Sequence, residues 1–236
     1  MTKATGMNKG KGDEKPPKYL YRYIPFERLA EILIRREIPV PRPQNWKDQH
    51  DLDNAVKKIP SGETVGIACF TSKCGTSFHW DLFAKYGVRL AFDASALEKC
   101  VHRVSKKQSG KNAQLKKVDY VTTKEYIKMV RNPKTDLLFV KRNQYESERE
   151  WRIVCLVSKP ATVHVAQYIP FEWDDLKKIT ISPHYSISDY HFHKAMILKM
   201  LESIGAKNIP VLRSSLFVSK KIKDAEAELD FEEDEK

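Results

Sequence analysis

The sequence predicts an α+β domain with a mixed, mostly antiparallel sheet, in one piece or split in two, flanked by helices. Apolar, β-prone runs alternate with amphipathic segments of helical period along the 236 residues. Short strands also cluster from Trp151 onward, which a doubly wound parallel sheet would not show. The chain has neither a Walker motif nor a dinucleotide-binding glycine pattern.

Two tails of biased composition flank a single predicted domain at residues 19–220. Residues 1–18 are rich in lysine, glycine and proline and have no apolar periodicity. Residues 221–236 are strongly acidic. Segments of this kind cannot bury enough apolar surface to fold, so we expect both tails to be disordered.

Charge is distributed unevenly along the chain. The formal net charge is +11. The last thirteen residues hold eight acids and one lysine, and the first eighteen hold five lysines and two acids, so +15 remains for residues 19–223. A body this basic favours nucleic acid or another anionic macromolecule, or an anionic small molecule, as partner. A lysine-rich solvated surface is the alternative.

The composition also predicts where the protein resides. No run approaches the ~18 apolar residues of a membrane span, and no signal peptide is apparent. The four cysteines form no Cys-x-x-Cys pair, and two lie in apolar runs. We therefore expect reduced, buried thiols in a cytoplasmic protein that binds no membrane.

The first half of the domain is predicted to alternate strands and helices. Pro25 is suited to open the first helix, which Arg36 ends, and three prolines then predict an extended loop that reaches Asp48. A helix that begins at Asp93 or Ser95 carries apolar residues as far as position 104. The remaining predicted elements are strands at Tyr19–Ile24, Val65–Thr71 and Val88–Phe92, and helices at Phe26–Arg36 and Ser77–Tyr86.

The second half is predicted to be richer in strands. Ser105–Lys117 is polar and rich in lysine, which indicates a mobile loop. A helix capped by Ser188 or Asp189 is expected to end at Gly205. The other predicted elements are a helix at Thr122–Val130 and strands at Val118–Val121, Ile153–Val157, Thr162–Val165, Lys178–Ser182, Ile209–Leu212 and Leu216–Val218.

The most informative stretch runs from Tyr145 to Arg152 and leads into the buried strand at Ile153–Val157. On an extended backbone, Glu146, Glu148 and Glu150 would share one face. Like charges in a row cost stability unless cations or a ligand offset them. We therefore expect this stretch to use at least one of its three carboxylates for binding or catalysis.

Other candidate residues precede this stretch. A guanidinium such as that of Arg22 can hold a diphosphate, and the flanking Tyr21 and Tyr23 can stack on a nicotinamide or a nucleobase. Thr71 and Ser72 end a strand, where a hydroxyl can orient the arginine or the substrate. His79 follows soon after and could reach the same site.

Simpler interpretations exist for these residues. Arg22 and Arg152 could be ion-pair partners of Glu148 or Glu150, and Thr71 and Ser72 could merely end a strand. The three histidines between positions 184 and 193 lack further ligands at suitable spacing, so no metal site is expected.

Several separated blocks resemble an uncharacterised bacterial family, domain of unknown function twenty-nine seventy-one. They are Leu20–Ile24 with Phe26–Arg28, Asn45–Asp48, Cys69–Thr71, His79–Trp80, Tyr86–Gly87, Lys141–Arg142, Tyr145, Glu148, Glu150–Arg152, Ile181–Pro183 and Val211–Ser215. The resemblance extends over residues 19 to 218. Trp46 and Gln49 depart from the family's pattern.

The order of arginine, hydroxyl and Glu-x-Glu is also similar to the arginine–serine–glutamate class of ADP-ribosyltransferases. This resemblance implies an ADP-ribosyltransferase-like fold, with Arg22 on the NAD phosphates and Thr71 or Ser72 positioning that arginine. It assigns the oxocarbenium-stabilising carboxylate to Glu150 and acceptor orientation to Glu148. No clear Ser-Thr-Ser triplet is present, because Phe70-Thr71-Ser72 is the nearest match.

The leading hypothesis is therefore an NAD-binding domain that modifies a macromolecular target, for which nucleic acid is a candidate, as a toxin or phage-defence effector. A non-enzymatic nucleic-acid-binding module is one alternative. A metal-dependent nuclease that uses Asp48, Glu148 and Glu150 as ligands is the other.

Overall fold

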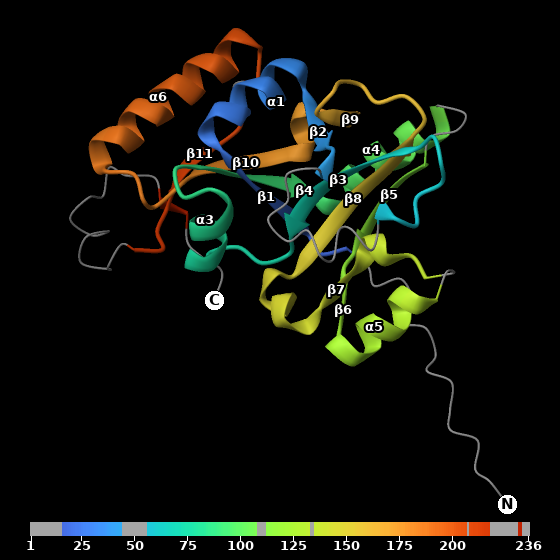
Figure 1. Ribbon diagram of the computed structural model, residues 1–236. Coiled ribbons are helices and arrows are strands. Elements are labelled where there is room, and N and C mark those ends of the chain that lie inside the picture. Colours follow the sequence, from blue (N-terminus) through green and yellow to red (C-terminus); the bar gives the residue numbers. More distant parts are fainter. Residues whose placement is uncertain are drawn as a thin grey trace, which may run out of the picture.

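The computed structural model describes residues 16–43, 56–107, 112–132, 135–206, 208–217 and 231–232. These residues form the predicted α+β domain, in which helices surround a mixed sheet (Figure 1). Seven of the sheet's strand pairings are given by register, five of them antiparallel and two parallel, which confirms a mixed, mostly antiparallel sheet.

The main sheet has eight strands in the order β12-β11-β10-β4-β1-β3-β8-β5. Their bounds are β1 (Tyr19–Pro25), β3 (Thr64–Thr71), β4 (Gly87–Asp93), β5 (Asn112–Lys117), β8 (Glu150–Val157), β10 (Leu176–Ile181), β11 (Val211–Ser214) and β12 (Phe231–Glu232). Two small sheets pair β2 (Glu37–Pro41) with β9 (Val165–Pro170) and β6 (Asp119–Val121) with β7 (Val140–Arg142).

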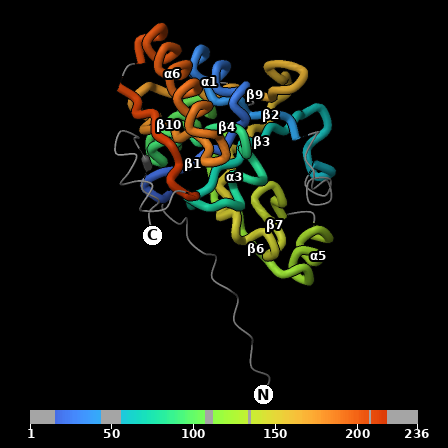
Figure 2. The backbone as a smooth tube through the Cα atoms, turned by 90° about the vertical axis from the view of Figure 1, so that its left-hand side faces the viewer, coloured from blue at the N-terminus to red at the C-terminus, as the bar shows by residue number. Residues whose placement is uncertain are grey.

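Helices cover both faces of the main sheet. On one face, apolar residues of α1 (Leu29–Arg35), α4 (Ala94–Lys107), α6 (Ile187–Ser203) and the β2–β9 pair form the larger core. On the other face, α5 (Thr123–Arg131) and the β6–β7 pair pack against β3 and β8 in a smaller core. The short α3 (Ser77–Phe83) covers β1 on this second face (Figures 1 and 2).

The sheet is nearly divided between β1 and β3. Tyr21↔Thr71 is the only register pair that joins these strands in the described residues, whereas β1 pairs with β4 along its whole length. The sequence left open one sheet or two, and the structure lies between these alternatives. The division matters because Thr71 is also paired with Glu150 on β8.

The first structural difference from the sequence prediction concerns the three prolines. Pro39 and Pro41 lie within β2 instead of an extended loop, and β2 pairs with β9 alone. Proline is compatible with such an edge position because only one side of the strand needs its N–H groups. Strand β9 also begins at Val165, where the prediction for Thr162–Val165 ended.

The second difference is that Ser105–Lys117 is largely ordered. Helix α4 extends through Lys107, and β5 begins at Asn112 and pairs with β8. Strand β5 has little apolar periodicity because it is an edge strand, in which only Ala113 is buried and Lys116 is exposed.

Smaller differences concern caps and ends. Thr76 and Ser186 cap α3 and α6, in place of Ser77 and of Ser188 or Asp189, and α3 ends at Phe83. Leu216 and Phe217 form a turn, not a strand. Phe231–Glu232 of the predicted acidic tail form β12, while most of both tails and the Asn45–Asp48 loop lie outside the described residues.

The close approach of β3 to the β2–β9 pair generates a prediction. A Cβ atom at Gly66 would lie 2.6 Å from the Ala166 Cβ and 2.8 Å from the Val40 carbonyl oxygen. Gly66→Ala should therefore push the two layers apart and lower the free energy of unfolding by ~1–3 kcal/mol, measured by urea denaturation. Unchanged stability of Gly66→Ala would show that the β2–β9 pair can move away from β3 without loss of packing.

Candidate active site at the start of strand β8

The two central glutamates lie on either side of a sharp turn. Asn143–Glu148 form a 3₁₀ helix, and β8 begins at Glu150. Arg149 between them has a φ of 46°, a left-handed conformation that is uncommon outside glycine. The backbone is therefore not extended as predicted, and it is this turn that brings both carboxylates together while Glu146 remains exposed.

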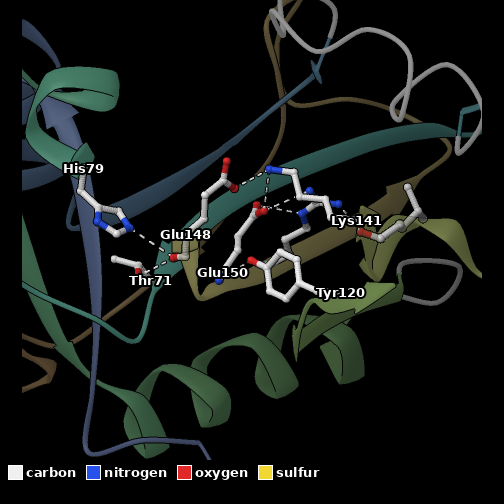
Figure 3. Close-up of polar contacts among 8 residues, drawn as sticks. Thr71, His79, Tyr120, Lys141, Glu148 and Glu150 are labelled. Carbon is white, nitrogen blue, oxygen red and sulfur yellow. Dashed lines mark hydrogen bonds and ion pairs between the residues drawn. The ribbon is translucent and has the colours of Figure 1, made fainter. Parts of the chain in front are cut away.

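Two cations hold the carboxylates inside the protein (Figure 3). The Lys141 amine on β7 lies 2.5 Å from Glu148 Oε2 and 3.1 Å from Glu150 Oε2. Arg152 donates from Nε to Glu150 Oε1 at 2.8 Å and from Nη2 to Oε2 at 3.1 Å. All four side chains are at most 13% exposed, so the charges balance within a buried cluster.

The cluster drives the two carboxyl pKa values apart. Burial raises the pKa of Glu150, but Arg152 and Lys141 outweigh burial and lower it to about 2. For Glu148, burial dominates over the attraction of Lys141, and its pKa is raised. Burial also opposes the charge of Lys141, but the two carboxylates raise the pKa of its amine.

Hydroxyl groups at the end of β3 fix the backbone of the turn. Thr71 Oγ1 donates to the Glu148 carbonyl oxygen at 2.8 Å. Ser72 donates to the Arg149 carbonyl oxygen from its amide N at 3.1 Å and from Oγ at 3.3 Å. In this structure, Thr71 and Ser72 therefore position the turn that carries the glutamates, whereas the resemblance implied that one of them positions Arg22.

His79 also contacts the Glu148 carbonyl group. Its Nε2 lies 3.2 Å from the Glu148 carbonyl oxygen, which can only accept, so Nε2 carries the hydrogen. Nδ1 then accepts from the hydroxyl of Thr76, the N-cap of α3. Burial lowers the pKa of His79, consistent with this neutral form. The structure thus brings His79 to the site, as predicted.

Aromatic rings and an arginine extend the site toward β1 and β4. Tyr21 pairs with Thr71 and Tyr23 with Arg89, so all four side chains share the sheet face of Glu150. The Tyr23 ring stacks on His79 with a centroid distance of 5.4 Å. The Arg89 guanidinium lies 5.2 to 5.8 Å from the ring centroids of Tyr21, Tyr23 and Trp80.

Arg22 lies on the opposite face of the sheet. Leu20, Arg22 and Ile24 follow one another at spacing two, so they share one face of β1, and Leu20 and Ile24 belong to the larger core. The Arg22 guanidinium lies 5.4 Å from the Phe70 ring centroid. Its Nη2 donates to the Pro39 carbonyl oxygen at 3.1 Å, and burial lowers its pKa to about 10. The structure therefore brings Arg22 neither to Glu148 nor to Glu150.

Tyr120 and Arg89 had no predicted role, and Lys141 was named only in the resemblance to domain of unknown function twenty-nine seventy-one. Tyr120 accepts a hydrogen bond from the Glu150 amide at 2.8 Å, and burial raises the pKa of its hydroxyl. A signal was available for Arg89, because it is the one charged residue between Val88 and Phe92 in an apolar strand. Tyr120 and Lys141 lie on three-residue strands, which carry no usable periodicity.

The described residues offer no group of three His, Cys, Asp or Glu side chains that could hold a metal ion. Asp48, one of the three predicted nuclease ligands, lies outside them. In place of a metal, Lys141 and Arg152 neutralise Glu148 and Glu150. The four cysteines are all free thiols, and no described helix is long and apolar enough to cross a membrane.

This arrangement engages the two carboxylates unequally. Both oxygens of Glu150 are taken up by cations, whereas only Oε2 of Glu148 is bonded to Lys141. Its Oε1 points away from Lys141 in Figure 3 and receives no hydrogen bond from the described residues. A carboxyl group of raised pKa can take up a proton or stabilise a nearby positive charge.

Comparisons with known proteins add distant likenesses. No family model matches the sequence, and no curated protein does, so the resemblance to domain of unknown function twenty-nine seventy-one stays a prediction. Two structures of DarT from Thermus sp. 2.9 are similar to the chain. One, in complex with NAD+, has 11% identity and a TM-score of 0.41, covering 84% of this chain and 96% of that one. The other, in complex with ADP-ribosylated ssDNA, has 10% identity and a TM-score of 0.39, covering 84% and 95%. Likenesses this distant do not fix an activity, which has to come from the geometry of the site.

The anchoring of the turn is tested at Thr71. Thr71→Val keeps the shape but removes the donor to the Glu148 carbonyl oxygen and the acceptor for the Lys73 amide. The free energy of unfolding should fall by ~1–2 kcal/mol in chemical denaturation. Ser72→Ala, at a less buried position on the same turn, is the matched control and should cost less than ~0.5 kcal/mol.

The lowered pKa of Glu150 predicts a pH dependence of stability. A carboxyl group with a folded pKa of about 2 and an ordinary value of 4.5 stabilises the fold above pH 4.5 by about 3 kcal/mol, and this stabilisation is lost as pH falls toward 2. Glu150→Gln should lose it at pH 7, so the difference from the wild type should shrink between pH 4.5 and 2. A constant difference in urea unfolding across this range would contradict the assignment.

Proposed function

We propose that the protein binds NAD and transfers its ADP-ribose to a macromolecular acceptor, a nucleic acid. The observation that supports this most is the convergence of Glu148 and Glu150 on one amine, with their pKa values moved in opposite directions. Paired carboxylates with separated pKa values are typical of enzymes that break glycosidic bonds. The Glu-x-Glu motif of the sequence resemblance supports the same class of reaction, whereas Arg22 lies outside the site.

The reaction breaks the bond between the nicotinamide nitrogen and the ribose C1′. Nicotinamide leaves with the electron pair of that bond, so positive charge develops on the ribose as an oxocarbenium-like species. A nucleophilic atom of the acceptor then forms the new bond to C1′ and gives up its proton. The site must therefore stabilise a cation and accept one proton.

Glu148 suits both tasks better than Glu150. Its Oε1 is not engaged by the described residues, and its raised pKa allows it to take up the acceptor's proton. Glu150 keeps Lys141 and Arg152 in place from within the sheet. This assignment reverses the one implied by the sequence resemblance, in which Glu150 was catalytic and Glu148 supporting.

The neighbouring side chains have compatible roles. The half-buried Tyr23 ring, held against His79, can stack on nicotinamide. Thr71, Ser72 and His79 hold the turn that carries Glu148, so they act through its backbone. A diphosphate bound on this face would not meet Arg22, which lies on the other one.

The proposal is tested by comparing two isosteric substitutions. Glu148→Gln should lower nicotinamide release from NAD by ~100-fold or more, because it removes the charge and the proton acceptor. Its melting temperature should fall only slightly, because Glu150 still contacts both Lys141 and Arg152. Glu150→Gln should instead lower the melting temperature, because it leaves Lys141 and Arg152 uncompensated.

Binding is measured separately from turnover. NAD should raise the melting temperature of the wild type and of Glu148→Gln by mass action. Full activity of Glu148→Gln would overturn its catalytic role. A chain stabilised by Mg²⁺ and not by NAD would favour the nuclease, and one that responds to an oligonucleotide alone would favour the non-enzymatic binding module.

A further inference from the structure

Helix α3 and the turn after it expose an unusual number of apolar side chains. Phe78 is 41% exposed, Phe83 42% and Tyr86 59%, and Leu82 between them is also exposed. We call Phe78, Leu82, Phe83 and Tyr86 the α3 surface. Rings exposed singly on a protein surface need no explanation, but several gathered on one short helix indicate an interaction site.

The α3 surface adjoins the candidate active site. His79, on the same helix, donates from Nε2 to the Glu148 carbonyl oxygen. The His79 ring contacts Phe78 at a centroid distance of 5.5 Å and Phe83 at 6.1 Å. His79 therefore links the backbone carbonyl group of Glu148 to the exposed rings of Phe78 and Phe83, and α3 contacts β1.

Basic residues accompany these rings. Lys85 is exposed, and its amine lies 5.9 Å from the Tyr86 ring centroid. Lys73 is exposed at the other end of the helix, close enough to His79 to help lower the pKa of that ring. Asp81, the one acid on α3, contacts His184 Nε2 at 3.0 Å.

We propose that the α3 surface binds a single-stranded nucleic acid and presents it to Glu148, a role that rests on the proposed transferase function. Exposed rings interleaved with cations are the means by which proteins bind single strands, since bases stack on rings while cations meet phosphates. The +15 charge of residues 19–223 complements such a polyanion. A duplex keeps its bases stacked on one another and cannot use the rings in this way.

The experiment measures binding of a labelled oligothymidylate of about 16 nucleotides by fluorescence anisotropy, without NAD. Phe83→Ala and Tyr86→Ala should each raise the dissociation constant by about 5-fold or more, since each removes one stacking partner. Phe192→Ala is the matched control, because Phe192 is 63% exposed on α6, does not belong to the α3 surface and should leave binding unchanged. The melting temperature of each variant shows whether it is folded, and the highly exposed Tyr86 tests the surface even if Phe83→Ala unfolds.

Salt dependence separates phosphate contacts from stacking. Lys73→Gln and Lys85→Gln should each reduce the slope of log Kd against log salt concentration by about 0.7. The proposal is overturned if the oligonucleotide does not bind, if Phe83→Ala and Tyr86→Ala bind it as the wild type does, or if a duplex of the same length binds equally well. Selective binding of a protein or of a second copy of the chain to this surface would also overturn it.

The outcome of the binding experiment is independent of whether the protein is a transferase. If the chain binds the oligonucleotide through these rings but never releases nicotinamide, the proposed binding surface is supported and the transferase function is contradicted. If the chain releases nicotinamide but does not bind the oligonucleotide, the transferase function is supported and the proposed binding surface is contradicted.

Discussion

The amine of Lys141 is the contact on which the site depends, because it lies between two carboxylates that would otherwise repel each other inside the protein. With Arg152 it makes the buried cluster neutral, which allows Glu148 and Glu150 to be buried as ions. Lys141 comes from β7, outside the main sheet. The β6–β7 unit is therefore needed for the site as well as for the smaller core.

The site is assembled from three parts of the fold. Strands β3 and β8 supply Thr71 and Glu150 as direct neighbours, α3 supplies His79, and β7 supplies Lys141. Each part is held by apolar packing that is unrelated to charge, such as the smaller core beneath β7. This division explains how a chain can maintain a strained residue, Arg149, at the centre: hydrogen bonds from Ser72 fix its carbonyl group.

Much of this could be read from the sequence, and the reasons for the failures are physical. Apolar alternation located β1, β3, β4 and β8, since these strands are buried along most of their length. The same signal missed β5 and misplaced β9, which lie at sheet edges. The spacing of the acidic residues drew attention to Glu148 and Glu150, which the structure places in one cluster, but treating their backbone as extended overlooked the turn at Arg149. Arg22 stands two residues from both Leu20 and Ile24, so the alternation in β1 already placed it on their face, which the structure shows to be the face of the larger core.

The near-division of the main sheet has a mechanical consequence. With one pair, Tyr21↔Thr71, connecting β1 to β3, rotation of the two halves about this point disturbs few backbone hydrogen bonds. Thr71 also donates to the Glu148 carbonyl oxygen, so such a rotation would move the backbone of the turn that carries the glutamates. The place where a relative movement of the two halves would cost the fewest hydrogen bonds is therefore also the place that anchors this turn.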